Sequence, residues 1–270
     1  MASELIIRSL YGGKVNIVHN PNARGRAPRY LVNNTEKPKG VTTILGQTLA
    51  KDLMQWAVDC MGQYLTEKLP RITGDDLKEG AKEYTRRRDG GASAGTEAHY
   101  MVEQFLKGEK SDGRSISPEA MKAVNAYKAW HEKVQPKIIN VEEVIYSMEH
   151  QYAGTYDGMM EIGGRVYLTD LKTTNASRKA PHGVYAENFI QLGAYAGAHE
   201  EQRLFEEANG GTTLPKIDGL AVISAKKDGK LHFVTNEDLG LPLDLCSQLF
   251  IEVVNIHRFL NSATKALGGK

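Results

Sequence analysis

The chain has few of the residues that build covalent or metal-linked scaffolds. It contains two cysteines, Cys60 and Cys246, among 270 residues. A zinc or iron–sulfur site made of thiolates needs three or four cysteines, so that kind of centre is excluded. A disulfide between the two is not expected in a reducing compartment. We therefore expect both to be buried thiols without a chemical role.

Long apolar runs are also missing. No stretch of the sequence approaches the roughly 18 residues that suggest a membrane span. The first residues, MASELIIRSLYGGK, lack the basic start and apolar core of a secretory signal. We expect a cytoplasmic protein with no membrane partner. Hydrophobic residues make up 41% of the chain and charged residues 25%, which is typical of a globular protein with a sizeable core.

Neither sign of charge is in excess, because 34 basic and 33 acidic residues leave a net charge of +1. The overall field therefore gives no attraction towards nucleic acid. Any one basic cluster is most simply solvated surface, but several beside candidate site motifs favour contact with phosphates. Basic residues gather in three places, namely between Asn20 and Gly40, at Arg86, Arg87 and Arg88, and at Arg178 and Lys179.

The N-terminal half is predicted to be helical after a short β-rich start, and it contains no internal repeat. The β-like pieces are Glu4–Leu10 and Tyr30–Val32. Thr42 or Thr43 can cap the first helix, and helical periodicity continues to about Arg88.

Gly90–Gly91 is expected to interrupt that helical region. New helices are predicted from Ala92 to Lys107 and from Pro118 to Val134, with Pro136 just beyond the second. We accordingly divide the chain into an N-terminal β/helical region over residues 1–90, packed on a core over residues 91–270.

The pattern changes after Pro136, where residues rich in Val, Ile, Tyr and Thr predict three consecutive antiparallel strands. They cover residues 138–148, 151–162 and 165–172, with a tight turn at Gly163–Gly164. A helix over 184–208, a hairpin of strands over 219–224 and 231–234, and a helix over 243–263 follow. The predicted fold class is α/β, a mixed β-sheet flanked by helices, with a helical N-terminal region.

Three polar groups are expected on one patch of this sheet. Side chains alternate across a strand, so Asp170 and Lys172 share a face while Leu171 points away. A hairpin that turns at Gly163–Gly164 sets Asp157 directly across from Asp170. Two carboxylates and an ammonium would then meet at one place.

These groups suit metal-assisted phosphate chemistry. Two carboxylates and the Leu171 carbonyl are hard oxygen ligands of the kind that Mg²⁺ prefers. A bound ion would polarise a scissile phosphate and lower the pKa of a bound water. Lys172 could orient that water or offset charge building on phosphorus. An isolated Asp-x-Lys is most often a surface salt bridge, and the opposed Asp157 is what favours a site.

Two further patterns carry less information when each is taken alone. Gly95-Thr96-Glu97-Ala98-His99 is expected to open a helix, with His99 on the inward face beside Val102. A lone inward histidine is usually a satisfied core residue. Gln191 and Tyr195 lie at i and i+4 on the helix after the third strand, where a simple hydrogen bond on the helix surface is the plainer interpretation.

Taken together, the four motifs resemble those of a known family. Gly-Thr-x-x-His, Gly-x-x-Asp, Asp-x-Lys-Thr and Gln-x-x-x-Tyr occur here in the order found in RecB-like nucleases of the PD-(D/E)XK superfamily. That branch includes mitochondrial genome maintenance exonuclease-like proteins and many phage exonucleases. Residues 40–45, followed by Trp56-Ala57, also look like the N-terminal region of phage-type members. The resemblance covers roughly Val41 to Tyr195 and implies a restriction-endonuclease-like core.

The resemblance also assigns roles to residues. It implies that His99, Asp157 and Asp170 ligate Mg²⁺ or Mn²⁺ with help from the Leu171 carbonyl, and that Lys172 is catalytic. Gln191 and Tyr195 would support the site. The residues that would contact nucleic acid are Arg86, Arg87, Arg88, Thr173, Arg178 and Lys179.

Two departures from the family pattern matter. The superfamily signature carries a further acid, so here Asp157 and Asp170 must fill both acidic roles. The cysteines that hold an iron–sulfur cluster in some RecB-like relatives are absent, so no such cluster is expected.

The function that follows is a metal-dependent DNA exonuclease acting on DNA ends in replication, recombination or host DNA breakdown. Its location would be the host cytoplasm if it is phage-encoded, and replication or recombination proteins would be its partners. Two alternatives stay open: a structure-specific or flap endonuclease, and a DNA-binding protein whose nuclease fold no longer cuts. The second is disfavoured because an inactive site has no physical need for four matching polar groups.

Overall fold

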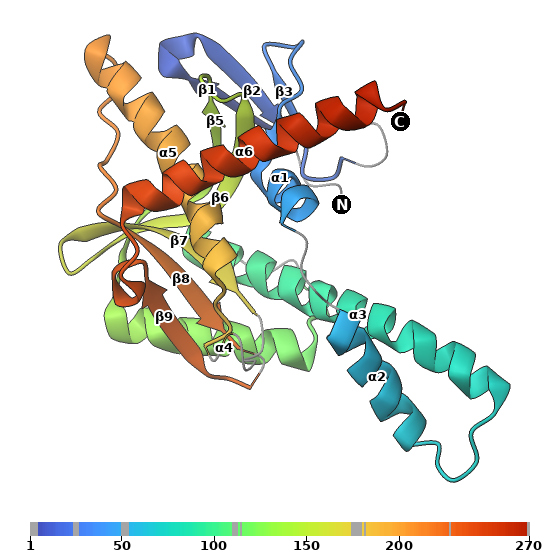
Figure 1. The fold of residues 1–270 in the computed structure, drawn as a ribbon. Helices are drawn as coiled ribbons and strands as arrows, with labels where there is room; N and C mark the ends of the chain where they lie inside the picture. The colour runs from blue at the N-terminus through green and yellow to red at the C-terminus, as the bar shows by residue number, and fades with distance from the viewer. Residues whose placement is uncertain are drawn as a thin grey trace.

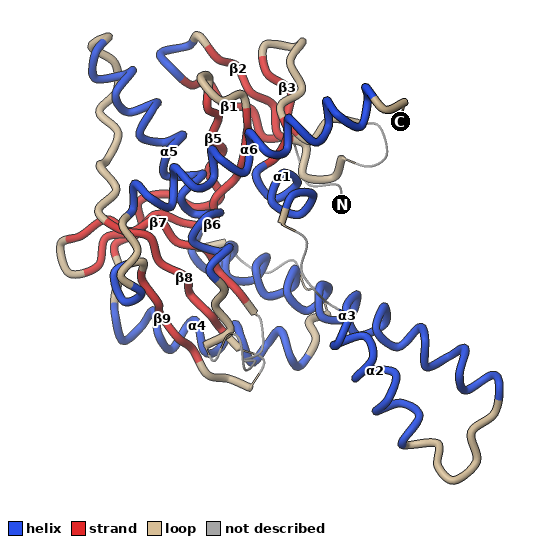
Figure 2. The backbone as a smooth tube through the Cα atoms, in the orientation of Figure 1, coloured by secondary structure: helices blue, strands red, loops and turns tan. Residues whose placement is uncertain are grey.

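The computed structural model describes residues 5–23, 27–49, 54–109, 113, 115–173, 180, 182–226 and 228–268. Figure 1 shows a body built on a large β-sheet and a helical arm that extends away from it. Helices lie against both faces of the sheet, as the tube in Figure 2 makes plain. The predicted α/β class, with a mixed sheet flanked by helices, is confirmed.

The main sheet has six strands and mixes parallel with antiparallel pairs. β5, β6 and β7 form consecutive antiparallel pairs, β8 lies parallel to β7, and β9 returns antiparallel to β8. The short β4 pairs parallel with the start of β6. The strands are β4 (Lys39–Gly40), β5 (Lys137–Ser147), β6 (Tyr152–Ile162), β7 (Arg165–Lys172), β8 (Gly219–Ala225) and β9 (Leu231–Thr235).

The predicted β6–β7 hairpin register is confirmed. Gly158 pairs with Thr169 and Ile162 with Arg165, so the ladder places Asp157 and Asp170 at matching positions just past its last pair. β6 changes partner beyond that point, because its other end pairs with β4 at Tyr152 and Ala153. Among the described strands, residues 154–157 of β6 therefore have no neighbour on this edge, and Asp157 lies where β6 and β7 separate.

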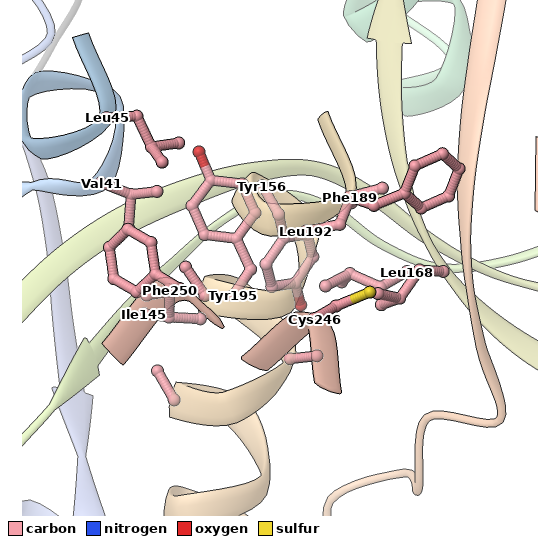
Figure 3. Packing of buried hydrophobic residues seen from close by; sticks show 14 of the residues in the cluster. Val41, Leu45, Ile145, Tyr156, Leu168, Phe189, Leu192, Tyr195, Cys246 and Phe250 are labelled. Carbon is pink, nitrogen blue, oxygen red and sulfur yellow. The ribbon is translucent and has the colours of Figure 1, made fainter. Parts of the chain in front are cut away.

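One face of the sheet is covered by α5 (Ala186–Ala208), α6 (Leu243–Ala266) and α1 (Val41–Thr48). Figure 3 shows the cluster that they bury, with Phe189, Leu192 and Phe250 among its largest members. The spacing of these apolar side chains fits helices that bury one side.

The opposite face packs against α3 (Gly74–Lys107) and α4 (Pro118–Val134). Val102 from α3 and Val124 from α4 meet Leu171 and Ile223 from the sheet. Neighbouring residues of β7 therefore face different helical layers, as strand alternation requires.

A second sheet of three antiparallel strands packs near the start of β6. Its strands are β1 (Ile6–Leu10), β2 (Val15–His19) and β3 (Tyr30–Val32), and the first two are joined by a 3₁₀ turn over Tyr11–Gly13. A second 3₁₀ turn, Glu237–Leu239, precedes α6. Tyr11 and Ile17 lie in one buried cluster with Tyr146 and Ala153 of the main sheet.

The predicted break at Gly90–Gly91 is wrong, because α3 runs unbroken through 34 residues. Glycine costs about 1 kcal/mol relative to alanine in a helix, which weakens the helix without ending it. The helix begins with a capping box between Thr73 and Asp76 and ends at Gly108, whose φ is 68°. The domain boundary expected at residue 90 falls inside this helix. Similarly, Gly40 caps α1 in place of the expected Thr42 or Thr43.

The arm consists of α2 (Met54–Thr66) and the first half of α3, which pack against each other (Figure 1). Both cysteines are buried free thiols, as predicted. No helix in the described part of the chain is both long and apolar enough to cross a membrane.

Candidate active site

Asp170 and Lys172 project from the end of β7 towards α5, where Gln191 meets them. The Lys172 Nζ atom lies 2.6 Å from Asp170 Oδ2. Lys172 also donates to Gln191 Oε1 at 3.4 Å, and Gln191 Nε2 donates to Asp170 Oδ1 at 3.3 Å. The amide of Gln191 thus contacts both charged groups and fixes their relative position.

Tyr195 is held in place from two sides. Its hydroxyl accepts a hydrogen bond from Gln191 Nε2 at 3.0 Å. Its ring lies against Gly154 so closely that a Cβ at that position would be 2.5 Å from the ring carbon Cε1. The position of the Tyr195 ring therefore leaves room only for glycine at residue 154.

Asp157 contacts both the neighbouring strand β7 and the helix α3. Its Oδ2 atom accepts a hydrogen bond from the Leu171 backbone N–H at 2.7 Å and lies 3.4 Å from His99 Nδ1. The His99 side chain comes from α3 and is 32% exposed, so it borders solvent and is not sealed in the core. The structure thus brings the Asp157 carboxylate against His99 and the Leu171 N–H, whereas the resemblance implies a role for the Leu171 carbonyl.

The helical context of His99 differs from the prediction. Gly95 and Thr96 lie deep within α3, and the Thr96 hydroxyl donates to the Ala92 carbonyl one turn earlier instead of capping the helix. Gly95 has another use, because a Cβ there would lie 3.1 Å from Thr173 Oγ1. The glycine lets α3 approach the end of β7 and carries His99 over Asp157.

Burial dominates the electrostatics of the site. Asp170 is 2% exposed, and burial raises its pKa to about 6 against the opposing effect of Lys172. Burial lowers the pKa of Lys172, but Asp170 and Asp157 outweigh it and the net pKa is raised. Burial also raises the pKa of Tyr195 well above its usual value. Lys172 therefore remains a charged ammonium beside a carboxylate that can titrate near neutral pH.

Glu142 belongs to the same site and was not predicted. It lines a cavity of about 20 Å³ with His99, Glu103 and Asp157. Its φ of 52° is unusual for a non-glycine residue. Burial first, and then Asp157 and Glu103, raise its pKa to about 8. The register of β5 on β6 sets Glu142 opposite Asp157, but that register cannot be deduced without knowing the turn between these strands.

The donor atoms fit a hard divalent cation in kind. Carboxylate and carbonyl oxygens come from Asp157, Asp170 and Leu171, with one imidazole from His99. Asp170 Oδ2 is buried and receives no well-aligned hydrogen bond from any described residue, although Lys172 Nζ lies beside it. Within the described part of the chain, no three His, Cys, Asp or Glu side chains are already gathered around one point. The chemistry of the donors suits Mg²⁺ or Mn²⁺, whereas a complete ligand shell is not preassembled.

The three arginines predicted to contact phosphates lie apart from this centre. Arg86, Arg87 and Arg88 are within α3 and do not precede a helix at residue 95; Arg88 is about 16 Å along the helix axis from His99. All three make ion pairs, which join Arg86 to Glu79 and Glu83, Arg87 to Glu83, and Arg88 to Asp89. Thr173 lies at the site beside Gly95. Arg178 and Lys179 fall outside the described residues.

No protein-family model and no curated protein matches this chain. Its assignment therefore depends on the four motifs and on the geometry into which they fold.

Proposed function

We propose that this protein is a metal-dependent deoxyribonuclease with a PD-(D/E)XK core, hydrolysing phosphodiester bonds from DNA ends. One observation carries the proposal: Asp170, Lys172 and Gln191 are in mutual contact at the point where β6 and β7 separate beside Asp157. A simple surface salt bridge does not account for a carboxylate that is 2% exposed.

The residues present suggest separate chemical roles for the metal ligands, for Lys172 and for Gln191. Bound Mg²⁺ or Mn²⁺ would polarise the phosphate and lower the pKa of a water, and Asp157, Asp170, His99 and the Leu171 carbonyl would hold it. Lys172 places a fixed positive charge where negative charge develops on the phosphate oxygens. The hydrogen bond to Gln191 holds this ammonium in position.

Burial of this arrangement strengthens each electrostatic contact. Tyr195 orients the Gln191 amide, and Gly154 leaves the room that the tyrosine ring needs. Charge interactions in such a water-poor site are stronger than in bulk solvent. The side chains are therefore positioned before substrate arrives.

Substrate would be bound mainly through phosphates, since Thr173 and the arginines of α3 can donate hydrogen bonds to phosphate oxygens. Arg86, Arg87 and Arg88 would have to exchange carboxylate partners for phosphates, so their contribution is expected to be modest. Exonuclease action on DNA ends remains the favoured activity, as the phage-type resemblance implies.

Oligonucleotides with labelled ends, incubated with Mg²⁺ or Mn²⁺ and sized over time, test the proposal. We expect stepwise shortening from free ends and protection when both ends are blocked. Internal cuts in blocked or flap substrates would indicate an endonuclease instead. Binding without cleavage would contradict the proposal, provided that Lys172→Ala, the matched inactive control, binds equally well.

A further inference from the structure

The polar face around Lys172 continues across the next two strands of the sheet. Lys172 pairs with Ser224 on β8, and Ser224 pairs with His232 on β9. Residues that pair directly across strands project to the same side of a sheet. Lys172, Ser224 and His232 therefore form a row that crosses β7, β8 and β9 and leads away from the candidate catalytic centre.

Burial of the neighbouring rows fixes the side on which these groups lie. Val222 and Val234, which follow Asp170 across the sheet, belong to the cluster beneath α5 and α6. Ile223 and Phe233 face the α3 and α4 layer with Leu171. Ser224 and His232 alternate with the second pair, so they face the α5 side together with Asp170 and Lys172.

Two more basic groups join this row. The ring of His182, just before α5, lies 4.6 Å from the ring of His232. Lys226 follows Ser224 on the same strand face and is 5% exposed. The pKa of His232 is lowered, first by burial and then by Lys226 and His182, as expected where positive charge is concentrated. At neutral pH its ring is an uncharged N–H donor.

The buried Ser224 hydroxyl is the observation that suggests a ligand at this place. It is fully buried, and among the described residues it has no hydrogen-bond partner. Leaving a buried hydroxyl unsatisfied costs about 1–3 kcal/mol, so such groups in folded proteins ordinarily have a partner. A hydroxyl, two imidazole N–H groups and an ammonium share one complementary partner, the oxygen atoms of an anion.

We infer that Ser224, His182, His232 and Lys226 form a phosphate-binding subsite for the single-stranded DNA backbone next to the scissile bond. This inference depends on the proposed nuclease function. Adjacent strands are about 4.8 Å apart, so the His232 backbone lies about 10 Å from that of Lys172, a span that a dinucleotide can cover. The subsite contacts phosphate and no base, and it holds substrates regardless of sequence.

A short, end-labelled, single-stranded oligonucleotide with one neutral methylphosphonate at successive positions tests the subsite. Binding is measured by fluorescence anisotropy in Ca²⁺, which is expected to support little turnover. Wild type should lose affinity several-fold when the phosphate next to the scissile one is neutral. His232→Phe, which keeps the ring contact with His182 but not the N–H donor, should bind unmodified DNA more weakly and be insensitive to that methylphosphonate.

Ser224→Ala separates a binding role from a structural one. Because the hydroxyl has no partner among the residues that the structure describes, its loss should leave thermal stability unchanged or higher while KM rises and kcat changes little. Because the Ser224 hydroxyl and the His232 ring are uncharged, the salt dependence of binding should stay unchanged in both variants while the affinity falls. His150→Ala, which changes a histidine in the β5–β6 turn, is the matched control and should behave as wild type.

Unchanged affinity for Ser224→Ala and His232→Phe, in preparations where wild type cleaves DNA, would overturn the subsite and leave the nuclease proposal intact. A wild-type protein that neither binds nor cleaves DNA would overturn both. A lower melting temperature for Ser224→Ala with unchanged KM would assign the hydroxyl to packing and contradict the inference.

Discussion

Asp170 and Lys172 touch each other, yet their removal is expected to have different effects. Asp170→Ala and Lys172→Ala should each reduce cleavage about 100-fold or more, through lost metal ligation and lost charge stabilisation respectively. Asp170→Ala should weaken Mn²⁺ binding. Lys172→Ala should not, because the ammonium lies 2.6 Å from the same carboxylate oxygen and competes with a cation. Calorimetric titration of Mn²⁺ into each folded variant measures this, and near wild-type turnover by either variant would exclude the assigned roles.

His99 offers a second test at the residue scale. His99→Ala should lose most activity, and excess Mn²⁺ should restore more of it than excess Mg²⁺, since nitrogen ligands favour Mn²⁺ somewhat. Binding of DNA should persist. Stability should change little, because the side chain is 32% exposed. If the variant instead unfolds at a lower temperature and keeps metal-dependent cleavage, the histidine is a packing residue.

Much of the site was predictable because its geometry is local. Strand alternation placed Asp170 with Lys172, and the two-glycine turn gave the β6–β7 register. Glu142 and Ser224 were missed for a common reason. Glu142 adopts an unusual backbone angle, and Ser224 lies on β8, which pairs with β7 across a long connection. Neither feature leaves a pattern in the sequence.

The packing of α5 on α6 can be tested at the element scale with two glycines of one helix. A Cβ at Gly193 would overlap the Cys246 carbonyl group, whereas a Cβ at Gly197 would lie 3.5 Å from Ser247 Cβ, an ordinary contact. Gly193→Ala should lower the free energy of unfolding by about 1–3 kcal/mol. Gly197→Ala, the matched control, should raise it by up to about 1 kcal/mol. Urea denaturation measures both changes.

Gly193→Ala should also reduce cleavage, because Gln191 lies on the same stretch of α5. Equal stability of the two alanine variants would mean that α5 and α6 are not in the close contact described.

Several long elements were predicted with accurate bounds, whereas two short strands and the continuity of α3 were missed. Residues 118–134 and 165–172 match α4 and β7, because apolar periodicity over many residues outweighs local exceptions. β2 and β4 were missed, since a few residues carry too little pattern. The continuity of α3 was missed because two adjacent glycines are locally unfavourable, while the capped ends and the packing of the C-terminal half sustain the helix.

At the scale of the whole molecule, attachment of the N-terminal sheet should make stability depend on pH. His19 is 3% exposed and stacks on Tyr30 at 4.8 Å. Burial, and then Arg29, lower its pKa from 6.5 to about 4. Between these values the unfolded chain binds more protons than the folded one, so the free energy of unfolding falls as pH falls from 6.5 to 4, by up to about 3 kcal/mol.

His19→Phe keeps the ring stack without the titrating nitrogen and should remove this part of the pH dependence. Urea unfolding of both proteins at neutral pH and near pH 4.5 provides the measurement. An identical loss of stability on acidification in the two proteins would show that His19 is not its source.

The α/β class and the order of most elements could be deduced from sequence, because they follow from periodicity and turns. The separation of β6 from β7 beside Asp157 could not, since it depends on β4 pairing with a strand more than a hundred residues later in the chain. That separation is what opens the sheet edge at the candidate site.

The requirement for a divalent metal tests the central claim most directly. Wild-type protein, dialysed against EDTA, is mixed with end-labelled DNA, and cleavage is followed before and after Mg²⁺, Mn²⁺ or Ca²⁺ is added. No cleavage is expected in EDTA. Mg²⁺ and Mn²⁺ should restore it, and Ca²⁺ should restore little, because its looser coordination polarises water less. Full activity in excess EDTA would contradict a metal-dependent mechanism at Asp157, Asp170 and Lys172.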